Sequence, residues 1–244
     1  IQEGNIEKNC AHIEELVRKH SSDDIDLLCF PELCISGYNF EKAIISDREA
    51  LFFSELASKY KIAIMAGINK KEGNQHYDVA CIWDETGTLL GEYKKIHLWD
   101  KENDFFAKGE ELVTVSFKGW TIGLLICADF GFSELAKSLA LKKNADVIMY
   151  PSAWNPGWDY LFSGCSSIRA AENQVYTVGL NRASGDVEYC GNTTVSNPDG
   201  TTLARLCTSE ESYTRVVLKK ECLEKAKETI PWRLMRREEV YNKI

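Results

Sequence analysis

Short apolar runs, each long enough for one buried β-strand, recur along this chain and constrain its fold more than any other feature. KIAIMAGI at 61–68, WTIGLLIC at 120–127 and DVIMYPSAW at 146–154 are three of them. A run that is apolar on both faces belongs to a sheet that is covered on both sides. The chain must therefore provide other elements that cover its sheets.

Helical patterns supply that cover. Ile6, Cys10, Ile13 and Val17 are spaced by four, three and four residues, which places them on one face of an amphipathic helix. Further helices are expected from the following residue patterns: 47–60 with Asp47 as N-cap, 133–144 beginning at Ser133, and about 159–173.

Hairpins interrupt the alternation of strands and helices. VACIWD pairs with TLLGEYKKIHL across a short turn, and LVTVSF pairs with WTIGLLIC. The remaining expected strands are IDLLCFPEL, QVYTVGLN, GNTTVSN, TTLARL and YTRVVLK. This mixture favours an α/β fold in which helices cover sheets from outside, rather than a purely parallel doubly wound sheet.

Size and composition fit one large domain over residues 1–244, with no internal repeat or composition break. The formal charge of −8 argues against nucleic acid or an anionic membrane as partner and suits the binding of a small molecule. No run is long enough to span a bilayer. Nine dispersed cysteines without a CxxC pair predict core thiols in a reducing cytoplasm, and neither a disulfide framework nor a zinc site.

Three polar residues stand out because each follows or closes an apolar strand: Glu32, Lys95 and Cys127. Strand ends meet at one rim of a layered α/β protein, where functional residues collect. Together the three supply a base, a cation and a nucleophile. An ammonium favours the thiolate, a carboxylate takes the thiol proton, and the cation stabilises the oxygen that becomes negative during attack on a carbonyl or nitrile carbon.

Three segments also carry a family resemblance. FPELCISGY (30–38), EYKKIHLWD (92–100) and GLLICADFGFSEL (123–135) resemble, in the same order, the signature blocks of the nitrilase or carbon–nitrogen hydrolase superfamily. Further similarity is found in GNIEKN, YPSAW, RAAENQVY, the pair Asn181-Arg182, NPDG and RREEVY.

This resemblance implies Glu32 as general base, Lys95 as the cation at the intermediate and Cys127 as nucleophile. It implies that Glu102 orients the lysine, although the neighbouring Asp104 is an alternative. The implied fold is a four-layer α-β-β-α sandwich that assembles as a homodimer or higher homo-oligomer. Members of the family usually begin with a strand ahead of the first helix, so a strand upstream of residue 1 is expected as well.

Neighbouring residues have competing interpretations. Strand alternation places Lys95 and His97 on one face and Lys94 on the other, so Lys95 is the lysine expected at the site. His97 is interpreted as a structural histidine bonded to backbone, and Asp129 as a residue that orients its loop. The expected substrate-binding residues are Ala128, through its backbone N–H, together with Tyr38, Tyr150 and Trp154 as pocket walls.

The residues after Cys127 bear on the substrate. Nitrile-hydrolysing branches resemble Cys-Trp-Glu at this point and dicarboxylate-monoamide enzymes resemble Cys-Tyr-Asp-x-Arg-Phe, whereas this chain has Ala128 and Gly131. We therefore expect hydrolysis of a small amide or N-carbamoyl compound through a thioester, with neither metal nor organic cofactor. A nitrilase, an amine-acyltransferase and a catalytically idle binding or scaffold protein remain alternatives.

Overall fold

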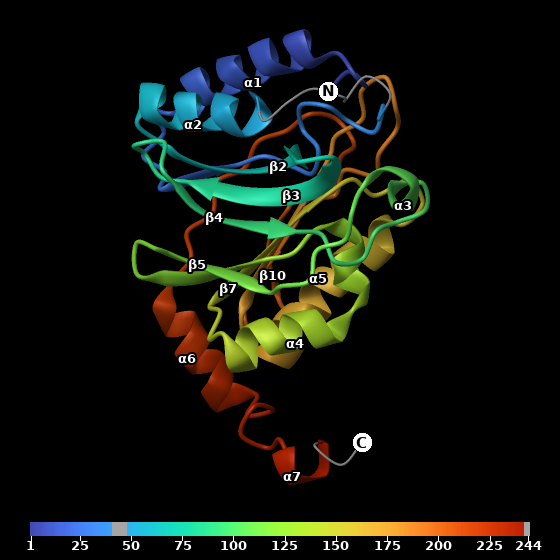
Figure 1. Cartoon of the computed structure of the whole chain (residues 1–244). Coiled ribbons are helices and arrows are strands. Elements are labelled where there is room, and N and C mark those ends of the chain that lie inside the picture. The colour runs from blue at the N-terminus through green and yellow to red at the C-terminus, as the bar shows by residue number, and fades with distance from the viewer. Residues whose placement is uncertain (41–47, 242–244) are drawn as a thin grey trace.

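The computed structural model describes residues 1–40 and 48–241, which form two β-sheets and the helices around them (Figure 1). Asp47, expected as a helix N-cap, lies outside the described residues. The first sheet has the order β1-β2-β3-β4, with β1 parallel to β2 and the other pairs antiparallel. Its strands are β1 (Leu27–Cys29), β2 (Ala63–Glu72), β3 (Gln75–Trp83) and β4 (Leu89–Lys94).

The second sheet has the order β10-β9-β8-β7-β6-β5. Its central strands β6, β7 and β8 are parallel, and the flanking pairs are antiparallel. The strands are β5 (Val113–Phe117), β6 (Trp120–Leu124), β7 (Val147–Ser152), β8 (Tyr176–Asn181), β9 (Thr194–Ser196) and β10 (Thr202–Arg205). The mixed pairing is what the alternation of helices and hairpins in the sequence predicts.

Helices cover the outer face of each sheet, and this confirms the expected four-layer α-β-β-α sandwich. In Figure 1, α1 (Ile6–His20) and α2 (Arg48–Tyr60) lie above the first sheet, while α4 (Ser133–Lys142) and α5 (Asp159–Asn173) lie below the second. The two sheets face each other in the middle of the molecule.

Strand alternation explains why both faces of the first sheet are apolar. In β2, Ala63 and Met65 pack in the layer between the sheets, whereas Ile64 and Ile68 pack against α1 and α2. The same alternation in β3 turns Ala80 toward the second sheet. A sheet buried on both sides therefore reads as a continuous apolar run.

Several elements differ from the sequence-based expectations. YTRVVLK at 213–219 is not a strand: its residues are largely exposed, and it pairs with no strand among the described residues. Three short or terminal helices were not predicted, namely α3 (Glu102–Phe105), α6 (Lys220–Thr229) and α7 (Glu238–Tyr241). A β-branched pattern alone does not form a strand, because strands require a neighbour that satisfies their backbone groups.

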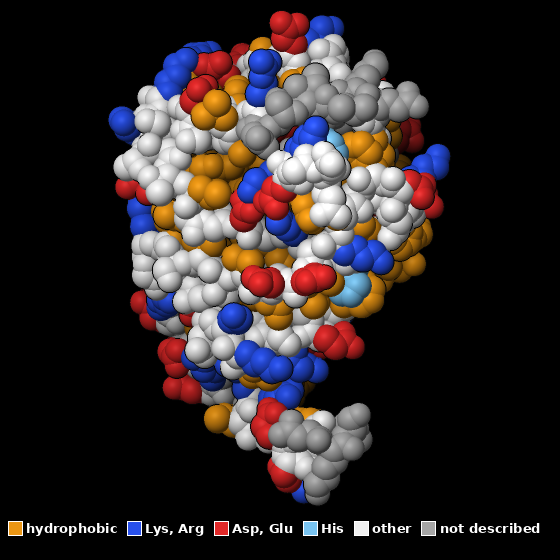
Figure 2. Space-filling view, viewed as in Figure 1, with side chains coloured by type: hydrophobic (Ala, Val, Ile, Leu, Met, Phe, Trp, Pro, Cys, Tyr) orange, Lys and Arg blue, Asp and Glu red, His pale blue; other side chains and the backbone are white. Residues whose placement is uncertain are grey.

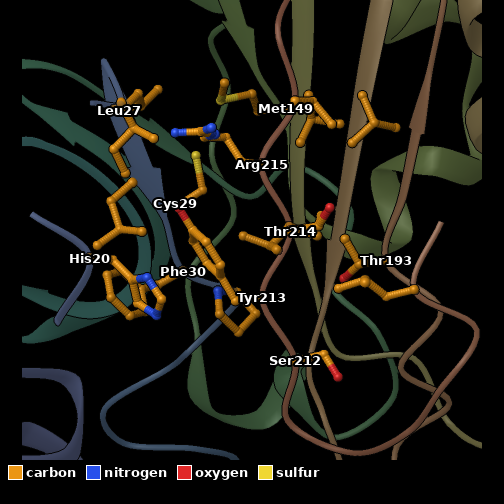
Figure 3. Close-up of a pocket in the computed structure, with 18 of the residues that line it drawn as sticks. His20, Leu27, Cys29, Phe30, Met149, Thr193, Ser212, Tyr213, Thr214 and Arg215 are labelled. Atoms are coloured by element: carbon orange, nitrogen blue, oxygen red, sulfur yellow. The ribbon is translucent and has the colours of Figure 1, made fainter. Parts of the chain in front are cut away.

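A cavity of about 710 Å³ lies between β1 and the inner face of the second sheet, beside residues 212–218 (Figure 3). Leu27 and Cys29 line it from one side and Met149 from the other. Glu32, Lys95 and Cys127 are not among its lining residues. The cavity is therefore distinct from the rim where the strand-end residues meet. The strand expected upstream of residue 1 stays a prediction.

Within the described part of the chain, none of the helices combines the length and the apolar character needed to cross a membrane.

Candidate active site

Three strand ends bring the predicted base, cation and nucleophile to the same rim of the sandwich. Glu32 follows β1, Lys95 follows β4, and Cys127 follows β6 in a short 3₁₀ turn, η1 (Cys127–Gly131). All three are buried, and the exposed fractions of Glu32, Lys95 and Cys127 are 0%, 1% and 8%. Buried polar residues from distant segments require partners, and Lys95 and Glu32 are partners of each other.

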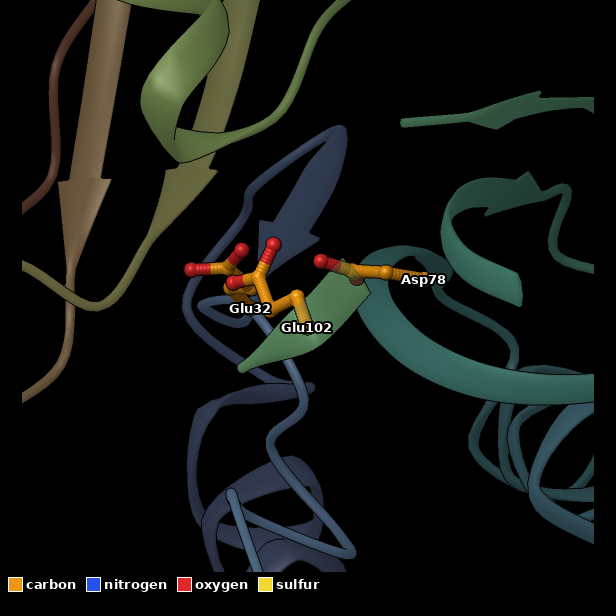
Figure 4. A group of neighbouring side chains, drawn as sticks. All are labelled: Glu32, Asp78 and Glu102. Carbon is orange, nitrogen blue, oxygen red and sulfur yellow. The ribbon is translucent and has the colours of Figure 1, made fainter. Parts of the chain in front are cut away.

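The ammonium of Lys95 lies at the centre of a group of carboxyl groups. Its Nζ donates to Glu32 Oε1 at 2.6 Å and to the Glu102 carboxylate at 2.8 Å, and it lies 3.3 Å from Asp78 Oδ2. Figure 4 shows the three carboxyl groups lying together, with Asp78 reaching in from β3. Glu102 is held further by the backbone N–H of Trp99 at 2.8 Å. Lys95 is thus locked in one position.

The turn that carries Cys127 is strained and firmly anchored. Cys127 has a φ of +43°, a left-handed conformation that is unfavourable for a residue with a Cβ. Asp129 fixes the turn by accepting hydrogen bonds from the Ile126 N–H at 3.0 Å and the Tyr93 hydroxyl at 2.7 Å. Since Tyr93 belongs to β4, the turn that carries Cys127 after the second sheet is hydrogen-bonded to the strand of the first sheet that leads to Lys95.

Electrostatics sets the protonation states of the central pair. Burial and the nearby Glu32 raise the pKa of the Cys127 thiol well above its usual value, although Lys95 opposes this. Burial lowers the pKa of Lys95, but Glu32, Asp78, Cys127 and Glu102 outweigh it and raise the pKa well above its usual value. The arrangement is a thiol beside an ammonium and carboxyl groups, so Cys127 could act as a nucleophile only if a base first removed its proton.

Two glycines allow the backbone to pack tightly around these residues. A Cβ on Gly67 of β2 would lie 2.5 Å from the Cα of Glu32, and one on Gly109 would lie 2.1 Å from the carbonyl oxygen of Lys94. Both distances are too short for any side chain. Gly67 and Gly109 are thus required for the close approach that positions Glu32 and Lys95.

The residues expected to bind substrate lie at different places. The Tyr38 hydroxyl donates to Glu102 at 3.1 Å, which puts Tyr38 beside the Lys95 cluster, and Ala128 is half-buried next to Cys127. Tyr150 is fully buried and stacks on Phe130 with ring centroids 3.6 Å apart. Trp154 is also buried, and its backbone N–H donates to Asn181 Oδ1 at 2.7 Å. Substrate contact by these residues stays a prediction.

His97 differs from its expected role in one respect. Its ring Nδ1 lies 2.9 Å from Asp129 Oδ1, so the ring bonds a carboxylate and not backbone. The same ring stacks on Phe132 with centroids 3.4 Å apart. His97 therefore reinforces the contact between the end of β4 and the turn that carries Cys127, and Asp129 accepts from both segments.

Sequence reasoning missed two residues of this site. Asp78 lies in β3 on the same face as Ala80, so the alternation of HYDVACIW could have indicated a carboxyl group in the layer between the sheets. Against the dominant effect of burial, a hydrogen bond from the Ala153 backbone N–H lowers the pKa of Cys127. No local pattern identifies Ala153, because its contribution comes from backbone brought close by tertiary packing.

Carboxyl oxygens of Glu32, Asp78 and Glu102 lie within 4.8 Å of one another, a spacing that also occurs around metal ions. The Lys95 ammonium already contacts all three groups. A divalent cation would compete with that ammonium for the same oxygen atoms and would be repelled by it. The donor set therefore fits a protein cation better than a metal ion.

Comparisons with known proteins give the family and the fold of the chain. A family model described as carbon-nitrogen hydrolase matches residues 2–225. A nitrilase of Pyrococcus abyssi (strain GE5 / Orsay) is 32% identical over 217 residues, which cover 84% of this chain and 81% of the relative. Omega-amidase NIT2 of Homo sapiens is 28% identical over 265 residues, which cover 99% of this chain and 92% of the relative.

A solved structure shares the fold. It is a mutant of the amidase from Nesterenkonia sp. AN1 and shows the result of Michael addition of acrylamide at that protein's active-site cysteine. Its TM-score with this chain is 0.86 at 24% identity, covering 99% of this chain and 95% of the neighbour. The four-layer architecture described above is thus that of a solved amidase.

Proposed function

The chain belongs to the carbon–nitrogen hydrolase family, and from this premise we propose that it hydrolyses the C–N bond of a small, neutral amide or N-carbamoyl compound by way of a cysteine thioester. The observation that carries the proposal is the buried contact of Lys95 Nζ with Glu32 Oε1 at 2.6 Å, near enough to the buried Cys127 for both residues to shift its pKa. Relatives described as omega-amidases and an amidase with the same fold support an amide substrate.

In the proposed first half-reaction, the Glu32 carboxylate takes the Cys127 thiol proton and the sulfur attacks the amide carbon. The Lys95 ammonium and the Ala128 N–H stabilise the negative oxygen of the tetrahedral intermediate. The intermediate then collapses: the C–N bond breaks, Glu32 returns its proton to the departing nitrogen, and ammonia leaves from a primary amide. An acyl group remains on sulfur as a thioester.

In the second half-reaction, Glu32 takes a proton from water and the resulting hydroxide attacks the thioester carbon. The same donors hold the new oxyanion, the C–S bond breaks, and Cys127 recovers its thiol proton from Glu32 as the carboxylic acid leaves. Glu102 takes no proton in this scheme. It orients Lys95 through its contact at 2.8 Å.

Charge supports a neutral substrate. Among the described residues, three carboxyl groups surround the Lys95 ammonium, so an anionic substrate enters against a negative field. Gly131 stands where the dicarboxylate-monoamide pattern has an arginine, and a Cβ added to it would meet open space. This chain therefore cannot form an ion pair with a substrate carboxylate at this position. Such an ion pair typically contributes a few kcal/mol, so its absence should lower the preference for a carboxylate substrate roughly 10- to 100-fold.

A panel of paired substrates tests the proposal. Ammonia release is measured for simple aliphatic amides, N-carbamoyl compounds, dicarboxylate monoamides and the matching nitriles. We expect the highest kcat/KM for a neutral amide or carbamoyl compound. Gly131→Arg is expected to raise kcat/KM for a monoamide relative to its neutral isostere. Absence of turnover across the amides and carbamoyl compounds contradicts the proposal.

A nitrilase activity is a second candidate because the relative from Pyrococcus abyssi carries that description. Preference for the nitrile of a pair over its amide would identify it. Addition of an amine nucleophile to the same assay detects acyl transfer as an amide product in place of the acid. Electrophile labelling detects an idle scaffold, whose Cys127 would stay unlabelled while the exposed Cys207 reacts.

We also propose that the protein self-associates through its carboxyl-terminal segment. Residues 231–241 extend from the body at the end of α6, as Figures 1 and 2 show. Trp232, Leu234 and Met235 are 50%, 83% and 68% exposed there. A second copy would bury this apolar surface. Sedimentation of the full chain should give a dimer or larger species, and Leu234→Glu should shift it toward the monomer.

A further inference from the structure

The residue that the proposed mechanism leaves unused is Asp78. Its side chain is fully buried, and both of its carboxyl oxygens lack a hydrogen-bond partner among the described residues. Among the residues that the structure describes, its one contact with a group of opposite charge is Lys95 Nζ at 3.3 Å. Glu32 Oε2 is likewise buried without a partner. A proton shared between these two neighbouring carboxyl groups would give each of them a hydrogen-bond partner.

Charge balance leads to the same conclusion. If Glu32, Asp78 and Glu102 were all ionised, three negative charges within 4.8 Å would face one ammonium in a buried site. Carboxylates that share a buried site do not all ionise, because repulsion and lost solvation favour the neutral form of at least one. One of the three therefore holds a proton.

Hydrogen bonding indicates which one. The Glu102 carboxylate accepts from Lys95, from the Tyr38 hydroxyl and from the Trp99 N–H, and Glu32 accepts the shortest contact from Lys95. Each of these donors stabilises an ionised carboxylate. Asp78 receives none, so it is the group for which ionisation is least favourable. Burial and Glu32 raise the pKa of Asp78 well above its usual value, against the opposing effect of Lys95.

We propose that Asp78 is a positioning residue of the site, whose protonated carboxyl group donates a hydrogen bond to Oε2 of Glu32. This bond satisfies the unpaired Glu32 oxygen and keeps Glu32 ionised as a base. It also holds the Glu32 carboxylate so that Oε1 faces Lys95. The inference rests on the proposed function for the role of Glu32, but the protonation of Asp78 does not depend on any substrate.

Infrared spectroscopy tests the protonation on the unaltered chain. A protonated carboxyl group has a C=O stretch that an ionised one lacks. The band of Asp78 should shift when the protein is labelled with aspartate carrying ¹³C in its side-chain carboxyl, and it should be missing from Asp78→Asn. Asp104→Asn is the control, because Asp104 is exposed at the same rim and should leave the spectrum unchanged. Absence of an aspartic acid band at neutral pH would overturn the proposal.

Kinetics tests the hydrogen bond. Asparagine cannot ionise but can donate to Glu32, so Asp78→Asn should keep kcat within about 3-fold of the parent. Asp78→Ala removes the donor and should lower kcat by about 10- to 100-fold with a smaller change in KM. Equal losses in both variants would mean that the charge of Asp78 matters, and equal retention would mean that it has no positioning role. Either result overturns the proposal.

The two proposals fail separately. Inactivity of the parent toward every amide and carbamoyl compound would contradict the proposed function. The infrared band would still test whether Asp78 is protonated. A missing band with normal amide turnover would contradict the role of Asp78 alone.

Discussion

The two sheets contribute different chemistry to the candidate site. The first sheet supplies the carboxyl groups and the ammonium, with Glu32 after β1, Asp78 in β3 and Lys95 after β4. The second sheet supplies Cys127 at the end of β6. Neither set performs the proposed reaction alone, since charges without a nucleophile form no thioester and a buried neutral thiol without a base does not attack. The relative position of the two sheets is therefore part of the proposed chemistry.

The two halves of the site, namely the residues from the first sheet and Cys127 from the second, are also held in place in different ways. Ion pairs and hydrogen bonds fix the first set, since Lys95 contacts three carboxyl groups. Backbone geometry fixes Cys127, which has a left-handed φ of +43° in a turn held by Asp129. Changes in the first half should therefore alter charge and pKa, whereas changes in the second half should alter geometry.

Cys127→Ser removes the contribution of the second sheet and should have the largest effect. A buried hydroxyl is a far weaker nucleophile than a thiolate, and we expect kcat to fall on the order of 10⁴-fold or more. The substitution is nearly isosteric, so the temperature of unfolding should change little. Ammonia release and thermal unfolding measure the two effects. Cys207→Ser, at an exposed cysteine, should keep full activity; substantial turnover by Cys127→Ser would rule out the assigned nucleophile.

Lys95→Met removes the cation of the first sheet and should have the next largest effect. Loss of the positive group at the oxyanion should lower kcat by about 10²- to 10³-fold. The buried carboxyl groups also lose their counter-charge, so the variant should take up protons and lose stability as pH rises. Single-turnover acylation and unfolding across pH measure both. Lys94→Met, on the opposite strand face, is the control, and a near-normal acylation rate for Lys95→Met would exclude its role.

Tyr93→Phe removes one of the hydrogen bonds between the first sheet and the turn that carries Cys127, without changing any of the proposed reacting groups. The buried hydroxyl of Tyr93 donates to Asp129 at 2.7 Å, and losing a bond to a charged acceptor should lower the free energy of unfolding by about 1.5–3 kcal/mol. We expect kcat to fall about 10-fold because the nucleophile turn shifts relative to Lys95.

Tyr60→Phe is the matched control for that variant. The Tyr60 hydroxyl also donates to a carboxylate, Glu14 at 3.0 Å, but near the surface. Its loss should change the free energy of unfolding by less than about 0.5 kcal/mol and leave kcat unchanged. Equal effects of the two substitutions would show that Tyr93 has no special role between the sheets.

The same division explains what the sequence could predict. Apolar strands that end in Glu32, Lys95 and Cys127 identify the rim, because residues at strand ends converge in a layered fold. Asp78 was missed because it sits inside a strand, where only its buried face marks it and its partners come from other segments. The segment 213–219 was assigned wrongly because local β-propensity does not reveal whether a strand has a neighbour.

Glu49 is a buried acid that packs against the first sheet but lies outside the candidate site. Its substitution should have the smallest effect on activity. Glu49 of α2 is buried on the helix side of the first sheet and accepts from the Asn69 N–H at 3.0 Å. Burial raises its pKa from 4.5 to about 8. The folded protein therefore holds a proton that the unfolded chain releases between these values, so the contribution of Glu49 to stability is largest below pH 4.5 and is lost as pH rises to about 8.

Glu49→Gln removes this titration and keeps a carbonyl oxygen for the Asn69 N–H. Relative to the parent, the variant should gain stability on the order of a few kcal/mol between pH 5.5 and 8.5, measured by urea unfolding at both values. Its kcat should match the parent at each pH. Glu55→Gln, at an exposed position of the same helix, should leave the pH dependence unchanged. If the stability of Glu49→Gln and that of the parent changed in parallel with pH, Glu49 would be ionised in the folded protein. Burial on the helix side of the first sheet would then not keep a carboxyl group protonated, in contrast to what we propose for the cluster around Lys95.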